Sequence, residues 1–338
     1  MDLSSLAPSV QKYFQDGLAP STQKTYAAAL RRFHAFCLKF NVSSPFPVSE
    51  HLLCCFASFL ADQGLAPQTG KGYLSAIRSM QISLGLPDPR EQSSLPLLKR
   101  VQAGISRAQV KKGTPVRIRL PITAHVLEQM GRKFRNSAHP HKVSLWAIAC
   151  TAFFGIFRLG ELLPESPNGA DPATSLVWGD VAVNNRENPT MVCIHLKISK
   201  CDQFGRGADI ILGHTRNTLC PVAAILQYIA TRGSVPGPFF LDAEGRTITK
   251  PWFIGQIREV LGSIGLPQHQ YAGHSFRIGA ATTAALAGVE DSVIQALGRW
   301  QSAAFLQYIR MPREQLATFS AVLASATNPA SSQNPPQQ

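Results

Sequence analysis

Three short motifs between residues 153 and 310 place arginine, histidine and tyrosine at defined spacings. The first is an apolar run that ends in Arg158, with Glu161 three residues further on. The second places His274 three residues before Arg277 at the expected start of a helix, and the third contains Tyr308. Residues three apart on a helix share one face, so Glu161 is expected to orient Arg158. Each motif alone is common, but together they supply cations, a proton carrier and a phenol nucleophile.

These side chains suit a reaction in which a phosphodiester is broken and rejoined without hydrolysis. The pentavalent state carries two negative charges on its non-bridging oxygens, and planar guanidinium groups match that geometry. A phenol that attacks phosphorus stays attached, so the bond energy is kept and resealing needs no ATP. Its usual pKa of about 10 requires a positive site and a base. The leaving 5′ oxygen needs an acid, which a lysine with a lowered pKa can provide.

Two lysines are candidates for this acid. Lys200 begins a polar turn between two expected strands, and Lys197 falls inside the first of these strands. We favour Lys200 because catalytic groups are frequent on loops that a rigid scaffold positions. Tyr228 and Tyr271 are alternatives to Tyr308, but one lies in a separate helix and the other is too close to the histidine motif. An ordinary amphipathic-helix tyrosine is the competing interpretation of Tyr308.

The composition indicates a folded, basic protein. The chain has 338 residues, 45% of them hydrophobic, which is enough for about two domains. Its 33 Lys and Arg against 20 Asp and Glu give a net charge of +13, which favours a nucleic-acid partner, although basic charge also serves solubility. Seven cysteines without Cys-x-x-Cys spacing favour an intracellular protein over a disulfide frame or zinc site. The longest apolar run, residues 145–157, is too short to span a membrane.

An internal repeat predicts two similar helix starts in the first third of the chain. The segment from Leu18 to Tyr26 recurs 47 residues later as the segment from Leu65 to Tyr73. In each copy a proline precedes apolar residues at helical spacing, and Ser49 is expected to cap a third helix between them. Helix N-termini bind phosphate, so both starts are expected to contact DNA unless they are ordinary solvated turns. The expected contacts are Thr22, Lys24, Thr69 and Lys71.

A basic stretch follows, in which no acidic residue occurs between Gln92 and Leu127. Gly113 and Pro115 interrupt it, and a stretch of one charge sign predicts a linker that follows a phosphate backbone. An ordinary solvated linker would mix both signs. The residues expected to contact DNA here are Lys99, Arg100, Arg107, Lys111 and Lys112.

The apolar pattern predicts a fold that is mainly α with a small β-sheet, in four parts. These are a helical domain (1–105), a basic linker (106–119), a mixed catalytic domain (120–324) and a disordered tail (325–338) that is rich in Asn, Pro, Ser and Gln. In the catalytic domain, strands are expected at 191–199 and 208–212. Helices are expected at 121–134, 141–163, 220–231, 250–264, 275–287, 290–297 and 303–324.

The motifs in this order resemble the tyrosine recombinase (phage integrase) superfamily, from about residue 21 to residue 323. The series is Arg158-x-x-Glu161, Lys200, His274-x-x-Arg277, Trp300 and Tyr308. The segments 273–277 and 298–300, with Tyr308-Ile309-Arg310, look most like the recombinases of eukaryotic DIRS-like and Ngaro retrotransposons or Cryptons. One departure is that the gap from Trp300 to Tyr308 is one residue shorter than is common in bacterial members, which leaves the helix register around Tyr308 open.

The resemblance implies roles for the motif residues. Arg158 and Arg277 would bind the scissile phosphate, with Glu161 supporting Arg158. His274 would assist the tyrosine proton. The remaining two implied roles concern Trp300, which would replace a second histidine of many relatives and donate its indole N–H, and Lys200, which would protonate the leaving oxygen.

The resemblance also implies the architecture and the partners. It implies a C-shaped clamp on double-stranded DNA, formed by a SAM-like helical core-binding domain and a catalytic domain, without metal or other cofactor. The apolar series Leu316, Phe319 and Leu323 is expected to form a C-terminal helix that joins a homotetramer on DNA, unless it folds back onto its own domain. The protein would be intracellular, and nuclear in a eukaryote. A non-cleaving DNA-binding protein and a type IB topoisomerase are the alternative functions.

Overall fold

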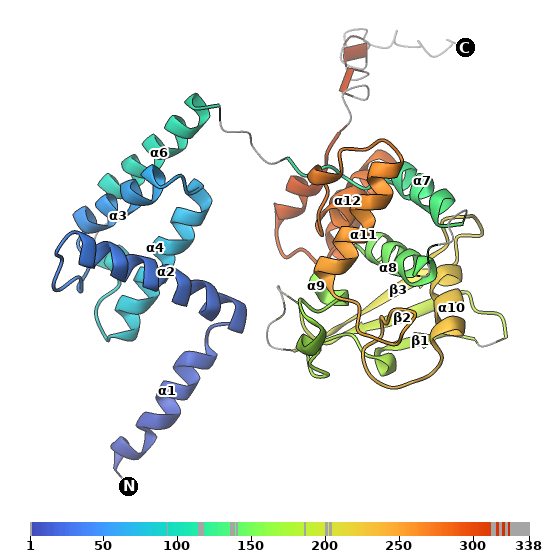
Figure 1. Ribbon diagram of the computed structural model, residues 1–338, viewed down its shortest axis with the longest axis horizontal. Helices are drawn as coiled ribbons and strands as arrows, with labels where there is room; N and C mark the ends of the chain where they lie inside the picture. The colour runs from blue at the N-terminus through green and yellow to red at the C-terminus, as the bar shows by residue number, and fades with distance from the viewer. Residues whose placement is uncertain are drawn as a thin grey trace, which may run out of the picture. The chain divides into compact units, whose positions relative to one another are not determined.

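The structure of the chain, a computed structural model, divides into two compact units, Met1–Val116 and Arg117–Gln338 (Figure 1). The residues that it describes are 2–92, 94–113, 118–135, 139, 141–185, 187–199, 202, 205–311, 316, 317, 320, 321 and 324. Among these, no helix is both long enough and apolar enough to cross a membrane.

The described part of the first unit is helical. As the repeat predicts, α2 and α4 both begin at a proline, and Ser49 caps α3 by accepting a hydrogen bond from the backbone N–H of Leu52 (3.1 Å). Its core is aromatic, with the ring of Phe56 packed 5.1 Å from Phe33 and 5.2 Å from Phe36 between centroids. The helices are η1 (Leu3–Leu6), α1 (Ala7–Asp16), α2 (Pro20–Lys39), α3 (Glu50–Asp62), α4 (Pro67–Ser83), α5 (Pro89–Gln92) and α6 (Pro96–Lys111).

The expected linker over 106–119 is shorter than predicted. Its first residues, as far as Lys111, continue α6, because Val101 and Ile105 pack against the apolar core and keep the chain helical. The boundary between the two units falls after Val116. Residues 114–117 and the predicted tail, 325–338, lie outside the described residues.

The helix α8 (Lys142–Phe154) lies at the centre of the second unit. Its residues are buried on nearly every side, and it contacts α7, α10, α11 and α12. An antiparallel sheet in the order β1-β2-β3 turns alternate residues of β2, among them Val192 and Ile194, toward the same core. The other elements are α7 (Ala124–Arg135), α9 (Leu159–Leu162), η2 (Pro167–Gly169), η3 (Trp178–Asp180), β1 (Val181–Val183), β2 (Met191–Leu196), β3 (Ala208–Gly213), α10 (Pro221–Arg232), α11 (Lys250–Ser263), η4 (Gln268–Gln270), α12 (Ser275–Leu286), α13 (Asp291–Leu297) and η5 (Ala303–Tyr308).

Two of the expected helices are corrected by the structure. The helix predicted over 141–163 ends at Phe154, and the chain turns at Ile156 (φ 47°) before α9. Gly155 allows this turn, because a Cβ at that position would lie 2.2 Å from the ring of Phe157. The helix predicted over 303–324 is interrupted as well: the short 3-10 helix η5 ends at Tyr308, and Ile309 is extended.

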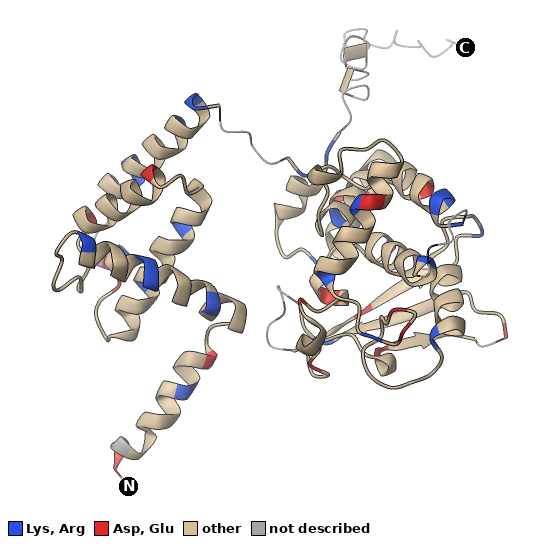
Figure 2. Cartoon of the chain, in the orientation of Figure 1, with Lys and Arg blue, Asp and Glu red and all other residues tan. Residues whose placement is uncertain are grey.

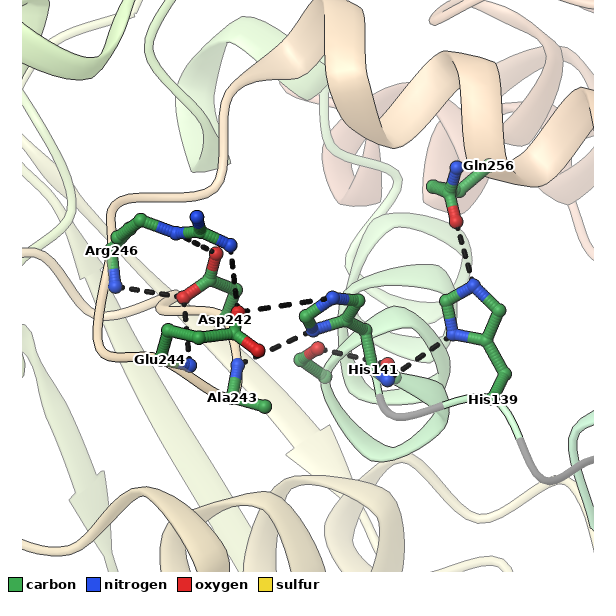
Figure 3. A network of polar contacts seen from close by, with 8 residues as sticks. His139, His141, Asp242, Ala243, Glu244, Arg246 and Gln256 are labelled. Carbon is green, nitrogen blue, oxygen red and sulfur yellow. Dashed lines mark hydrogen bonds and ion pairs between the residues drawn. The ribbon is translucent and has the colours of Figure 1, made fainter.

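A polar network holds the start of α8 (Figure 3). The Nδ1 of His141 accepts a hydrogen bond from the backbone N–H of Ala243 (3.3 Å), and the backbone N–H of His141 donates to Nδ1 of His139 (3.1 Å). The Nε2 of His139 then donates to Oε1 of Gln256 on α11 (2.8 Å). Asp242, beside Ala243, is held by the guanidinium and backbone of Arg246. The start of α8 is therefore joined to α11 and to the turn at 242–246, which helps to set the position of Arg158 beyond its other end.

The segment that enters the second unit packs along α12. The backbone N–H of Ile122 donates to the carbonyl of Ser275 (2.9 Å), and that of Ala124 donates to Oγ1 of Thr283 (3.1 Å). The backbones are so close at Gly279 that a Cβ there would lie 1.7 Å from the carbonyl oxygen of Ile122. The segment 118–124 is therefore part of the support for α12, the helix that carries the His-x-x-Arg motif.

Candidate active site

Arg158 and Glu161 form an ion pair at the start of α9. Oε1 of Glu161 accepts a hydrogen bond from Nη1 of Arg158 (2.8 Å), and Oε2 accepts from the backbone N–H of the same residue (2.9 Å). The side chain of Arg158 is 15% exposed and that of Glu161 is 6% exposed. The predicted orientation of Arg158 by Glu161 is present in the structure, and it is a charge-assisted contact with little competition from solvent.

Arg277 lies on α12 and is completely buried. Its Nη1 donates to the carbonyl of Ile156 and its Nη2 to the carbonyl of Gly298, so that the guanidinium fork joins two turns of the chain. The guanidinium carbon lies 3.9 Å from the ring centroid of Trp300 and 5.5 Å from that of Tyr308. Arg277 is therefore packed against these two rings, and it is not among the residues that line the cavity described below.

His274, Trp300 and Tyr308 come together beside one cavity. The ring of Tyr308 lies 5.2 Å from that of Trp300 and 6.2 Å from that of His274 between centroids. The cavity has a volume of about 950 Å³, and its wall includes these three residues, Arg158 and Lys250. The site thus presents a phenol, an imidazole and a guanidinium to one space that a substrate can enter.

The backbone of Tyr308 is tied to the helix that carries the histidine and the buried arginine. Oγ1 of Thr282 on α12 donates to the carbonyl of Tyr308 (3.3 Å) and accepts from the backbone N–H of Arg310 (3.0 Å). The side chain of Thr282 is fully buried. These bonds replace helical hydrogen bonds at this point, which explains why the chain leaves the helical path after Tyr308 and how the register of the tyrosine is set.

The site concentrates positive charge around one carboxylate. Burial, followed by the charge of Arg158, lowers the pKa of Arg277 to about 10, so this guanidinium is still charged at neutral pH.

Neither Nε of Arg277 nor Nε1 of Trp300 has a hydrogen-bond acceptor among the described residues. A buried donor without an acceptor costs about 1–3 kcal/mol, so the surroundings of these two donors favour an anionic ligand.

Of the two lysines that are candidates for the acid, the structure describes Lys197 only. Lys200 lies outside the described residues, so its contacts are not part of the structure. Lys197 follows β2 directly, and its Nζ forms an ion pair with Asp180 and donates to the carbonyl of Ser175 (3.3 Å). Only 25% of the Lys197 side chain is exposed. The lysine ammonium of Lys197 is therefore held in a structural contact between β2 and the segment before β1.

The residues predicted to contact DNA lie in the first unit, along α2, α4 and α6 and just after α6. Figure 2 shows Lys and Arg along α2 and at the end of α6. Thr22, in the first turn of α2, is partly buried. The exposed members of the set are Lys24, Thr69, Lys71, Lys99, Arg100, Arg107, Lys111 and Lys112. All nine are thus available, wholly or in part, to a ligand of this unit.

The sequence motifs did not identify Arg299 as part of the site. Its Nη2 lies 3.2 Å from Oε2 of Glu161, and its Nη1 donates to the carbonyl of Gly155 (3.1 Å). The one signal was its place between Gly298 and Trp300, inside a quoted motif. Arg158 and Arg299 therefore both pair with Glu161, and the charge of Arg277 is near enough to interact with the same carboxylate. No group of three or more His, Cys, Asp or Glu among the described side chains is arranged to hold a metal ion.

Of the predicted C-terminal apolar series, Leu316 is exposed (53%). Phe319 and Leu323 lie outside the described residues.

The chain is similar to known proteins in sequence and in fold. No family model matches the chain. A curated relative, an integrase/recombinase XerD homologue of Selenomonas ruminantium, is 25% identical over 312 residues, which cover 88% of this chain and 83% of the relative.

Two solved structures are similar in fold. The XerH site-specific recombinase bound to a palindromic difH substrate superposes with a TM-score of 0.62 at 16% identity, over 89% of this chain and 79% of that chain. A lambda integrase tetramer bound to a Holliday junction superposes with a TM-score of 0.56 at 12% identity, over 90% and 77%. The first is described as a site-specific recombinase and the second as an integrase. The chain, mostly helical with a small three-stranded antiparallel sheet, has the tyrosine recombinase fold.

Proposed function

We propose that the chain is a site-specific recombinase, which cuts and rejoins DNA through a covalent bond between Tyr308 and a 3′-phosphate. The observation that carries the proposal is the convergence of Arg158, His274, Trp300 and Tyr308 on one cavity, backed by the buried Arg277. The relative and the two structural neighbours support the same reaction class, since each is described as an integrase or recombinase. No metal and no ATP take part in this scheme, because the phosphotyrosine bond conserves the energy of the broken bond.

In the cleavage step, the phenol oxygen of Tyr308 attacks phosphorus and the bond to the 5′ oxygen breaks. His274 assists removal of the phenol proton, from a ring that lies 6.2 Å from the tyrosine ring between centroids. Arg158, which faces the cavity, binds a non-bridging oxygen while Glu161 holds its other side. Trp300 directs an indole N–H without a described acceptor toward the phosphate.

Arg277 stabilises the pentavalent state from the far side of the aromatic rings. Its guanidinium keeps its charge, and in the low-dielectric interior that charge acts more strongly than it would in water. Direct contact with the phosphate follows when Trp300 and Tyr308 shift on DNA binding. Catalytic contacts often form only in the substrate complex. Arg277 is therefore a candidate although it does not line the cavity in the absence of DNA.

The proton for the leaving 5′ oxygen comes from Lys200 in this proposal. Support comes from the place of Lys200 in the sequence between β2 and β3 and from the ion pair of Lys197 with Asp180. The ammonium of Lys197 is already held by Asp180 and by the carbonyl of Ser175, whereas the acid of this step has to reach the leaving oxygen.

The first unit supplies most of the affinity for double-stranded DNA. Lys24 and Lys71, the fifth residues of α2 and α4, are exposed near helix N-termini that favour phosphate. Arg100, Arg107 and Lys111 add an exposed basic side of α6. The second unit, which carries the candidate active site, would bind the same duplex.

The assembly on DNA is proposed to be a tetramer joined by the segment after Met311. The lambda integrase neighbour is described as a tetramer on a Holliday junction, and Leu316 exposes an apolar side chain in this segment. A chain truncated before Pro312 is expected to bind a single DNA site but to lose tetrameric complexes. Gel filtration of the protein on DNA with two sites checks this. A truncated chain that still forms tetramers would contradict the proposal that the segment after Met311 joins neighbouring protomers.

The biological setting is proposed to be integration of a mobile element of the DIRS-like, Ngaro or Crypton type. The support is the form of segment 273–277 and of Gly298-Arg299-Trp300. The protein would act inside the cell, and in the nucleus of a eukaryote.

A nicked DNA substrate, from which the short fragment with the free 5′-hydroxyl escapes after cleavage, tests the proposed reaction. Wild-type protein is expected to accumulate a covalent protein–DNA adduct, and Y308F is expected to form none, because phenylalanine lacks the attacking oxygen. DNA binding by Y308F should equal that of the wild type. Binding without adduct by the wild type on every site offered would favour a non-cleaving DNA-binding protein, and relaxation of supercoiled plasmid without a target site would favour a topoisomerase.

A further inference from the structure

Arg299 contacts the same carboxylate that orients Arg158. Its Nη2 lies 3.2 Å from Oε2 of Glu161, while Nη1 of Arg158 lies 2.8 Å from Oε1. Glu161 is thus held between two guanidinium groups, one on each oxygen. The side chain of Arg299 is 16% exposed, so solvent screens this contact little.

Arg299 also braces the turn that precedes Arg158. Its Nη1 donates to the carbonyl of Gly155 (3.1 Å), and its Nη2 donates to the carbonyl of Ile156 (3.4 Å). The carbonyl of Ile156 is also an acceptor for Arg277. The Ile156 carbonyl therefore connects Arg299 to Arg277, while Glu161 connects Arg299 to Arg158.

The backbone at both ends of this brace is strained. Ile156 (φ 47°) and Arg299 (φ 58°) are left-handed although neither is glycine, and such a conformation is an outlier for a β-branched residue. It persists only where the surroundings hold it, and it occurs often at active sites. At Gly298 a Cβ would lie 1.6 Å from the ring of Trp300, so this ring closes over the same turn.

Arg299 itself is absent from the wall of the cavity, whereas Arg158 and Trp300 form part of it. Arg277 is absent from this wall as well, so the role of Arg299 follows from its contacts. These include Glu161 and the carbonyls of Gly155, Ile156 and Leu297.

We propose that Arg299 is a positioning residue of the recombinase site, which sets the guanidinium groups of Arg158 and Arg277 through Glu161 and the Ile156 carbonyl. The inference rests on the proposed function. Three arginines and one glutamate leave a net charge of two positive units at the site, which matches the two negative charges of the pentavalent phosphate. Arg299 adds its own charge there, and it also sets the positions of the guanidinium groups of the other two arginines.

The test compares R299Q with the wild type in single-turnover adduct formation on nicked DNA. At saturating DNA the rate is expected to fall about 10- to 100-fold, which is typical when a residue that orients a functional ligand is lost. The affinity for DNA is expected to change less than about 3-fold, since most phosphate contacts lie elsewhere. R299K should recover part of the rate, because an ammonium can pair with Glu161 but cannot also reach both carbonyls.

A double variant separates positioning from simple stabilisation. If Arg299 acts through Glu161, the R299Q/E161Q variant should be no slower than the slower of the two single variants. R132Q is the control, because Arg132 forms an exposed pair with Glu128 on α7 of the same unit. It should cleave at the wild-type rate.

The outcomes against the proposal are distinct. A wild-type rate for R299Q, or losses that multiply in the double variant, would overturn it while the proposed function stands. If R299Q melts below the assay temperature, R299K takes its place, and an unchanged rate for R299K overturns the proposal. A wild-type protein that forms no adduct on any site overturns the proposed function and this inference together.

Discussion

The R277K variant is expected to form the covalent adduct about 10³-fold more slowly than the wild type, at saturating DNA. Arg277 donates to the carbonyls of Ile156 and Gly298 at once, under the rings of Trp300 and Tyr308. An ammonium is a point charge that cannot reproduce this fork, so the turns on either side lose their common donor. The loss therefore combines weaker stabilisation of the pentavalent phosphate with misplacement of the tyrosine.

The R277K variant is also expected to show a different dependence on pH. Burial and the charge of Arg158 lower the pKa of Arg277 to about 10, and the same two causes lower the pKa of a lysine at this position. Lysine starts from a lower usual pKa of about 10.4, so its charge is lost at a lower pH than the charge of arginine. The ratio of the variant rate to the wild-type rate should therefore fall as the pH rises through the range in which this lysine deprotonates.

Single-turnover measurements over a series of pH values check both statements. R132K is the matched control, since Arg132 is an exposed arginine with one partner on its own helix. It should match the wild type at every pH. A rate for R277K within tenfold of the wild type would mean that Arg277 has only a structural role.

The G279A variant is expected to destabilise the second unit by about 3 kcal/mol or more, although it adds one methyl group. The added Cβ would lie 1.7 Å from the carbonyl oxygen of Ile122 and 2.8 Å from the nitrogen of the same residue. These are backbone atoms, so no side-chain rotation relieves the clash. The segment bonded to Ser275 has to leave α12, or α12 has to move, and either shift disturbs the helix that carries His274 and Arg277.

Thermal unfolding followed by circular dichroism measures this effect, which should lower the melting temperature by roughly 10 °C. The matched control is G255A on α11, where no atom lies within 4 Å of an added Cβ. Alanine has the higher helix propensity, so G255A should leave stability unchanged or raise it by up to about 1 kcal/mol. Equal melting temperatures for G279A and the wild type would show that the segment 118–124 does not pack on α12 as described.

Local signals in the sequence predicted much of the fold. The prolines of the repeat predicted the starts of α2 and α4, and apolar spacing predicted the strands β2 and β3 and the helices that follow them. The strand β1 was not predicted, because it has three residues and no alternation of its own to detect. Gly155 gave no warning that α8 ends there, because the ring of Phe157 lies over the glycine only once the chain turns and Phe157 is buried in the core.

The candidate site was predictable in its members and less so in its geometry. Arg158, His274, Trp300 and Tyr308 were named from type and spacing, and the structure brings all four to one cavity. The burial of Arg277 behind the aromatic rings was not predictable, because it depends on how η5 returns across α12.

The bracing by Arg299 was missed for a similar reason. Its left-handed backbone and its bond to Glu161 arise only when two turns, far apart in the sequence, meet in the folded unit. A motif shows which residues are present but not how their backbone is bent.

Peptide mapping of the covalent adduct tests the central claim most directly. Wild-type protein is trapped on nicked DNA, the DNA is digested to a short nucleotide remnant, and the tryptic peptides are analysed by mass spectrometry. The account predicts one modified peptide, the one that ends at Arg310, with the nucleotide on the oxygen of Tyr308 through its 3′-phosphate. A remnant on Tyr228, Tyr271 or any other residue, or a 5′-phosphate linkage, would contradict it.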